Sequence, residues 1–268
     1  MLSITDLPFV QKACRRLARH GWRNTLRQLF FRLLKATVQF RILRGLHLDR
    51  VNPAYLECDG PFSSGFQPPR ALRRFASEPA NEISPRFVAH AMAQGDQCYA
   101  VCEGARLVSS GWYSTRPTPI GSPELVLHFD PQYVYMYKGL TREPYRGQRL
   151  YAVGVSRALD HYLRKGARGF VSYAEVTNLD SLKASFRMGY RHFGSIYLLR
   201  LFGRQFAFAS AGCRAFGFRV EVKRLVAGTA RGNRPQRFDA PTADAYVPGV
   251  KAERPTNPLF WLKTRRTA

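Results

Sequence analysis

Apolar and polar positions follow a clear order between residues 133 and 194. An apolar, strand-like segment runs from Val134 to Leu140 and leads into a short basic turn, residues 144–149. Apolar residues then recur at spacings of three and four, which predicts an amphipathic helix. Those positions are Tyr151, Val155, Ala158, Leu159, Tyr162 and Leu163. A turn of this kind presents backbone N–H groups at a helix N-terminus, where they favour phosphate.

A second strand and a second helix follow further along the chain. The apolar run Phe170–Val176 predicts the strand. Asn178 or Asp180 is a suitable N-cap for the helix, and Gly189 is a suitable residue to end it.

These two segments together resemble the GNAT superfamily of acyl-CoA-dependent acyltransferases. Arg146-Gly147-Gln148 matches the start of the family's pyrophosphate loop. Four later residues match, in order and spacing, the segment that flanks the pantetheine arm: Asn178, Ser181, Gly189 and Tyr190.

The resemblance covers residues 70–200, and residues 95–112 look like the family's central hairpin. It implies an α/β (α+β) fold of GNAT type: a mixed, mainly antiparallel sheet that splays between two strands, with helices on both faces. We expect this domain over residues 51–225. A basic, amphipathic helical extension is expected over residues 1–50, and a Pro-rich, basic, irregular tail over residues 226–268.

The resemblance also implies acetyl-CoA, or another acyl-CoA, as donor substrate, and no metal. The backbone of Leu140 and Thr141 would pair with the pantetheine amides, while Asn178 and Ser181 flank the arm. Five consecutive residues would hold the pyrophosphate: Arg146, Gly147, Gln148, Arg149 and Leu150.

The sequence departs from the family pattern at two loop positions, where Arg149 and Tyr151 replace small residues. Close approach of the backbone to a pyrophosphate normally favours glycine. A guanidinium at position 149 could offset this by forming charge-assisted bonds to phosphate.

Direct attack of an amine or hydroxyl on the thioester is the reaction that the resemblance implies. Glu175, on the strand before Asn178, is the candidate base, with Glu143 and His128 as alternatives. Ser185 lies at the position where many family members carry a tyrosine that acts as the general acid. The predicted catalytic set is Glu175, Ser185 and Asn178.

Two further tyrosine hydroxyls, those of Tyr151 and Tyr173, are other candidates for the acid. A cysteine nucleophile is unfavourable, because Cys98 and Cys102 lie on a predicted strand without a nearby histidine. These two thiols are expected to be small core residues instead of a disulfide. The five cysteines form no CxxC pair and no metal-ligand spacing, which fits a reducing compartment.

The net charge of +24, from 42 Lys and Arg against 18 Asp and Glu, exceeds what one CoA molecule requires. Such a charge favours a polyanionic partner: an anionic membrane, nucleic acid or phosphorylated substrates. Nucleic acid is the least favoured of these, because no recognised nucleic-acid-binding module accompanies the charge.

The N-terminal charge is patterned. Residues 12–50 hold eleven Lys and Arg and one acid, Asp49. On a helical wheel, one side gathers Trp22, Leu26, Leu29, Phe30, Leu33 and Phe40. This face either lies in an anionic membrane interface or docks on the enzyme domain. The tail ends in an apolar cluster, residues 259–262, beside basic residues, and the same two alternatives hold for it.

No apolar run reaches the roughly 18 residues that a membrane-spanning helix needs, and no signal-peptide pattern precedes the domain. We therefore expect a cytoplasmic protein, with peripheral attachment to the cytoplasmic face of a membrane. The acceptor would be a small or lipid-linked molecule; the oligomeric state is left open.

Strands over residues 195–202 and 216–222 are expected to close the sheet. Two other functions compete: a GNAT-shaped binding or scaffold protein, and a transferase that takes its acyl group from acyl-carrier protein.

Overall fold

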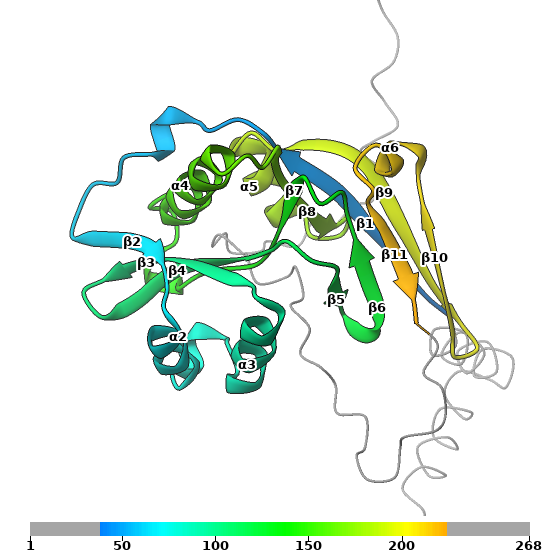
Figure 1. Ribbon diagram of the computed structural model, residues 1–268, viewed down its shortest axis with the longest axis horizontal. Coiled ribbons are helices and arrows are strands. Elements are labelled where there is room, and N and C mark those ends of the chain that lie inside the picture. The colour runs from blue at the N-terminus through cyan, green and yellow to red at the C-terminus, as the bar shows by residue number, and fades with distance from the viewer. Residues whose placement is uncertain (1–37, 224–268) are drawn as a thin grey trace, which may run out of the picture.

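One large sheet organises residues 38–223, the part of the chain that this computed structural model describes (Figure 1). Its eight strands lie in the order β10-β9-β1-β8-β7-β4-β3-β2. Every neighbouring pair is antiparallel except β7 and β8. The strands are β1 (Val38–Leu48), β2 (Phe62–Phe66), β3 (Gln97–Glu103), β4 (Arg106–Ser114), β7 (Tyr133–Thr141), β8 (Gly169–Glu175), β9 (Arg191–Leu201) and β10 (Arg204–Ala209).

A second, three-stranded sheet has the order β11-β6-β5. Its strands are β5 (Thr118–Ile120), β6 (Ser122–His128) and β11 (Arg219–Val222). The α-helices are α2 (Pro69–Ala76), α3 (Pro85–Gln94), α4 (Leu150–Arg164), α5 (Leu179–Arg187) and α6 (Ala211–Arg214). Short 3-10 turns are η2 (Pro53–Tyr55), η3 (Pro79–Asn81) and η4 (Glu143–Tyr145).

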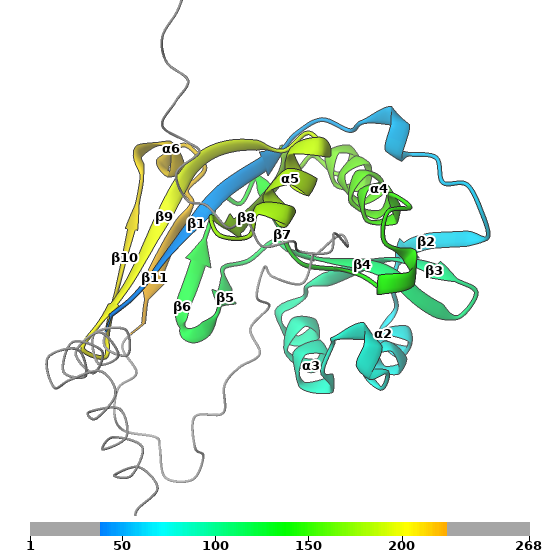
Figure 2. The same ribbon diagram turned by 180° about the vertical axis from the view of Figure 1, so that it is seen from behind.

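Helices cover both faces of the large sheet (Figures 1 and 2). On one face, Phe75 of α2 packs in the same core as Trp112 of β4. On the other, Leu159 of α4 and Leu182 of α5 pack in a core with Met136 of β7. Burying apolar surface on both sides stabilises such a layered arrangement. The predicted α/β fold class, a mixed and mainly antiparallel sheet with helices on both faces, is confirmed.

The sheet splays between β7 and β8. These strands are parallel neighbours, but they pair only from Tyr133↔Gly169 to Tyr135↔Val171. Both strands then continue, β7 to Thr141 and β8 to Glu175, without further pairing to each other. The predicted splay between two strands is confirmed.

The N-terminal boundary differs from our prediction. Residues 38–48, assigned from the sequence to the helical extension, form β1 between β8 and β9. Leu43 and Leu46 of this strand are buried. The helical wheel mixed Phe40 with residues before it, because the pairing that fixes β1 is with strands far away in the sequence. The domain therefore includes Val38 onward. The rest of the predicted extension, residues 1–37, and the predicted tail, residues 226–268, lie outside the described residues.

The closing strands also differ in part. The segment expected at residues 195–202 is the longer β9, and it continues into β10. The segment expected at residues 216–222 becomes β11, which pairs with β6 in the small sheet and not with the large one. Within residues 38–223, no helix is long and apolar enough to cross a membrane.

Candidate active site

The segment that connects β7 to α4 and contains the basic turn is anchored at two points. At its start, the Nε of Arg142 donates to Asn81 Oδ1 at 2.8 Å, and the same guanidinium forms an ion pair with Glu78. At its middle, the Tyr145 hydroxyl donates to Glu103 Oε2 at 2.5 Å. These contacts fix the turn against η3 and β3 before α4 begins.

The turn itself has the geometry of an anion-binding site. Gly147 has φ +85°, and a Cβ there would meet no heavy atom within 4 Å. Arg149, the N-cap residue of α4, is left-handed with φ 60°. No described side chain caps α4. The open backbone at Gly147, the first N–H groups of the helix and the exposed Arg149 thus suit a phosphate group.

The other predicted loop residues are divided between the surface and the core. Gln148 is exposed. Leu150 is 2% exposed and packs with Val101 and Val108, so only its backbone is available to a ligand. The Nε of Arg146 donates to the carbonyl oxygen of Thr141 at 3.3 Å, which ties the turn to the end of β7.

Leu140 and Thr141 are buried at the end of β7, next to β4. Ser109 Oγ donates to the Leu140 carbonyl at 2.8 Å and lies 3.0 Å from Thr141 Oγ1. Both residues also pair with β4 in the sheet. Contacts between the backbone of these two residues and an acyl donor would therefore use the edge of β7 that faces the splay.

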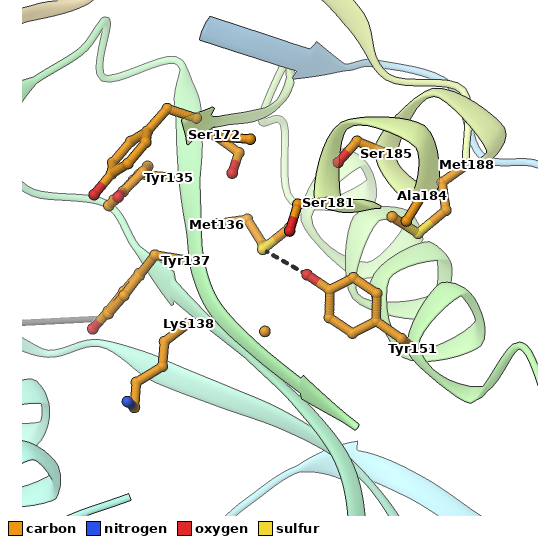
Figure 3. A pocket seen from close by; sticks show the side chains of 13 residues that line it. Tyr135, Met136, Tyr137, Lys138, Tyr151, Ser172, Ser181, Ala184, Ser185 and Met188 are labelled. Atoms are coloured by element: carbon orange, nitrogen blue, oxygen red, sulfur yellow. Dashed lines mark hydrogen bonds between the residues drawn. The ribbon is translucent and has the colours of Figure 1, made fainter. Parts of the chain in front are cut away.

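A cavity of about 50 Å³ lies in the splay (Figure 3). Its walls are residues 135–139 of β7, residues 172–174 of β8, Tyr151 of α4, and Ser181 and Ser185 of α5. The structure thus brings the two predicted serines to the place where β7 and β8 separate.

A bulge in β7 lies at this point. Lys138 has φ +46°, and the register with β4 shifts between Ser110, opposite Leu140, and Trp112, opposite Tyr137. An extra residue in one strand bends that strand and re-aims its neighbours. The Nζ of Lys138 lies 5.0 Å from the centroid of the Phe87 ring, on the side of α3. The bulge was not predicted from the sequence.

Tyr151 lies directly against the bulged strand. Its hydroxyl donates to Met136 Sδ at 3.3 Å (Figure 3). Its ring occupies the space beside Gly139, where a Cβ would come within 2.6 Å of two ring carbons. The bulky residue that departs from the family pattern therefore forms a wall of the cavity. A glycine inside a strand is the signal that could have revealed this close approach.

Asn178 has a clear local role at the start of α5. Its Oδ1 accepts from the Ser181 N–H at 3.0 Å, so it is the N-cap. Gly189, with φ +98°, follows the end of the helix, and Tyr190 N–H donates to the Ser185 carbonyl at 3.1 Å. The N-cap and the glycine predicted from the sequence are confirmed.

Glu175 forms an ion pair with Arg41 of β1, and the Nε of Arg41 donates to its Oε1 at 2.5 Å. The sequence gave no indication of this contact, since Arg41 had been assigned to the helical extension. The alternative bases lie elsewhere. Glu143 is exposed on η4, and His128 Nε2 lies 2.7 Å from Glu221 Oε2 in the small sheet. None of these three side chains lines the cavity.

A buried carboxyl that the sequence did not single out lies beneath the same strand. Tyr137 donates from its hydroxyl to Asp96 Oδ2 at 2.5 Å, and Asp96 is 8% exposed. Burial raises the pKa of Asp96, against opposing hydrogen bonds from Ser114 and Tyr137. Burial also raises the pKa of the Tyr137 hydroxyl. The pair supports the face of β7 opposite α4.

The cysteines match their expected structural role. Cys98 and Cys102 are free thiols in the core, and burial raises the pKa of both. A thiol held in its neutral form is a poor nucleophile. Within residues 38–223, no group of three or more His, Cys, Asp and Glu side chains could hold a metal ion.

The comparisons with known proteins concern the fold alone. No protein-family model and no curated protein matches the sequence. The fold is similar to a GCN5-related N-acetyltransferase-like protein from Streptococcus suis, at 13% identity and a TM-score of 0.43, covering 68% of each chain. It is also similar to a GNAT-family acetyltransferase from Colwellia psychrerythraea, at 14% identity and a TM-score of 0.43, covering 64% of this chain and 57% of that one.

A GCN5-related N-acetyltransferase from Sphaerobacter thermophilus is similar at 12% identity and a TM-score of 0.43, covering 69% of this chain and 56% of that one. The chain thus spans between 56% and 68% of the length of these three proteins.

Proposed function

We propose that the protein is an acyltransferase that moves an acyl group, most simply acetyl, from acetyl-CoA to an amine or hydroxyl. The observation that carries this proposal is the splay. β7 and β8 separate after three paired positions, and the separation opens beside a turn that suits phosphate. A long, thin donor with a pyrophosphate at one end and a thioester at the other matches that combination.

The donor contacts follow from the geometry of the turn and the strand. Arg146 and Arg149 form charge-assisted bonds with the pyrophosphate, and the backbone from Gly147 to Leu150 donates to it. The free edge of β7 at Leu140 and Thr141 pairs with the pantetheine amides. Asn178 and Ser181, at the start of α5, flank the arm on the other side.

The cavity must enlarge for this donor. Pockets that hold drug-sized ligands measure roughly 300–1,000 Å³, whereas the cavity in the splay measures about 50 Å³. The Tyr151 side chain fills the space beside Gly139, and its hydroxyl donates to Met136 Sδ. Donor binding therefore turns the Tyr151 ring away from Gly139.

The reaction is direct acyl transfer. The acceptor nitrogen or oxygen attacks the thioester carbonyl carbon, a backbone N–H of β7 stabilises the oxyanion, and the carbon–sulfur bond then breaks. The acceptor's proton leaves to water, and the departing thiolate takes a proton from Tyr151, which solvent reprotonates. We assign this role to Tyr151 over Ser185 because a phenol is the stronger acid. Glu175, held by Arg41, positions β8 against β1.

The acceptor is proposed to be a small or lipid-linked molecule at the cytoplasmic face of a membrane. The net charge of +24 supports this, since it attracts an anionic leaflet and phosphorylated acceptors.

A binding or scaffold role without turnover is the second candidate. It is favoured by the Tyr151 ring over Gly139 and by the engagement of Glu175 with Arg41. A donor carried by an acidic acyl-carrier protein is a variant of the first proposal that the basic surface also suits.

Calorimetry with acetyl-CoA, longer acyl-CoAs and acyl-carrier protein tests donor binding, and thiol release across a panel of amines and amino sugars tests turnover. We expect binding and turnover that fall in Gly147→Val and persist in Gly166→Val, a glycine of similar φ (+90°) just beyond the far end of α4. Donor binding without thiol release would support the scaffold role. No binding by any donor would overturn both.

A further inference from the structure

The turn between β9 and β10 carries an exposed phenylalanine where local structure disfavours one. Phe202 and Gly203 form the two-residue turn, with φ +48° and +78°. Two positive φ values define a type I′ turn, for which Asn-Gly is the preferred pair. Phe202 is nonetheless present, and 77% of its surface is exposed. Neither turn geometry nor core packing explains this side chain.

An aromatic face extends from this turn along the sheet. Register places Phe208 opposite Tyr197, and it places Phe206 and Phe40 on either side of Leu199. Phe40 and Tyr197 stack with ring centroids 6.4 Å apart. The four aromatic residues are strongly exposed: Phe40 58%, Tyr197 38%, Phe206 40% and Phe208 59%.

The opposite face of the same strands is ordinary protein core. Leu43, Ile196 and Leu198 are buried there together with Val220 of β11. The arm formed by β9, β10 and the first half of β1 reaches away from α4 and α5 (Figures 1 and 2). Within residues 38–223, these strands are held by one buried face, and the aromatic face stays exposed.

Two arginines flank the turn in the sequence. Arg200 and Arg204 bracket Phe202 and Gly203, and both are exposed. Val38, where the described chain begins, pairs with Leu201 beside the turn. The basic segment before residue 38 thus joins the arm at this end.

We propose that Phe202 and the aromatic face form a surface that enters the interface of an anionic lipid bilayer. Phenyl rings partition to the boundary between headgroups and acyl chains, and the two arginines meet lipid phosphates. A second copy would bring the same charge of +24 to the contact.

This surface is separate from the splay between β7 and β8. Its loss leaves donor binding and transfer to a soluble acceptor unchanged, so its test is independent of the acyl-transfer proposal.

Co-sedimentation of the full chain with vesicles tests the proposal, using phosphatidylcholine alone and phosphatidylcholine mixed with phosphatidylglycerol. Phe202→Asn is the decisive variant, because Asn-Gly suits the turn and preserves the fold. We expect the partition coefficient onto the mixed vesicles to fall roughly tenfold, as the loss of one phenyl ring that is buried in the lipid interface implies. Phe206→Ser with Phe208→Ser should lower it further. The control Phe186→Ser, an exposed ring on α5, should leave it unchanged.

Several results would overturn the proposal. One is equal binding of Phe202→Asn and the unaltered protein, and another is equal recovery on the two kinds of vesicle. Loss of all binding on deletion of residues 1–37, with no effect of the arm variants, would assign attachment to that segment instead. A dimer that the arm variants dissociate, seen by light scattering without change in vesicle binding, would assign the face to a second copy.

Discussion

The ring of Tyr151 rests on the backbone of Gly139, so closely that a Cβ at residue 139 would stand 2.3 Å from the tyrosine hydroxyl oxygen. One residue comes from the first turn of α4 and the other from the bulged part of β7. The absence of a side chain at 139 thus lets a bulky residue occupy a position where the family pattern has a small one. This pair sets the width of the cavity in the splay.

Gly139→Ala should destabilise the protein by about 1–3 kcal/mol, because overpacking forces the Tyr151 ring to move. The same change made in a Tyr151→Ala background should cost much less, since the opposing ring is gone. Denaturant unfolding of the four proteins of this cycle measures the coupling. Additivity of the two single changes would contradict the contact.

Tyr151→Phe should lower kcat by about a hundredfold or more while leaving donor affinity intact, as expected for loss of a general acid. Ser185→Ala is the matched comparison and should have a small effect. Steady-state kinetics with acetyl-CoA and calorimetry separate the two quantities. The reverse pattern, with the larger loss in the serine variant, would transfer the role to Ser185.

Arg146→Ala and Arg149→Ala should each weaken donor binding roughly ten- to a hundredfold, because a hydrogen bond to a charged group contributes about 1.5–3 kcal/mol. Rising salt should weaken binding to the unaltered protein and narrow these differences. Arg164→Ala provides the control, since this residue is 78% exposed at the far end of α4. Equal losses in all three variants would indicate a general charge effect and not a pyrophosphate site.

Glu175→Gln should lower the free energy of unfolding by about 1–2 kcal/mol, as loss of a charge-assisted bond between β8 and β1 implies. Its kcat should stay within about threefold of the original value, because this carboxylate is engaged by the guanidinium of Arg41 and does not line the cavity. The pH profile of kcat decides the question. A large loss of kcat together with disappearance of its fall at acidic pH would restore Glu175 as the proton acceptor.

Asp96→Asn should raise stability at neutral pH and lose this advantage in acid. Because burial raises the pKa of Asp96, the folded state favours the protonated carboxyl. The stabilisation that this protonated carboxyl gives the folded state is fully present below the ordinary pKa of aspartate, about 3.9. It is lost as the pH rises through the raised pKa of Asp96 in the folded protein. Asparagine can still accept the bond from Tyr137. Unfolding in denaturant at neutral pH and near pH 4 compares the two proteins; a constant difference would contradict the shift.

Local patterns in the sequence determined much of the central unit. The spacing of apolar residues from Tyr151 to Tyr162 predicted α4, and the confirmed cap at Asn178 predicted the start of α5. The hairpin of β3 and β4 was expected from residues 95–112. Such elements depend on residues close together in the chain, so periodicity and capping chemistry suffice to find them.

The tertiary structure alone decided the features that join distant residues. β1 is a strand because β8 and β9 pair with it on either side, although its sequence continues a basic, helix-like pattern. The ion pair of Arg41 with Glu175 spans 134 positions. The approach of Tyr151 to Gly139 depends on the bulge at Lys138 and the angle at which α4 crosses β7. Long-range pairing and packing fix these contacts, and a local pattern carries no information about the distant partner that supplies the energy.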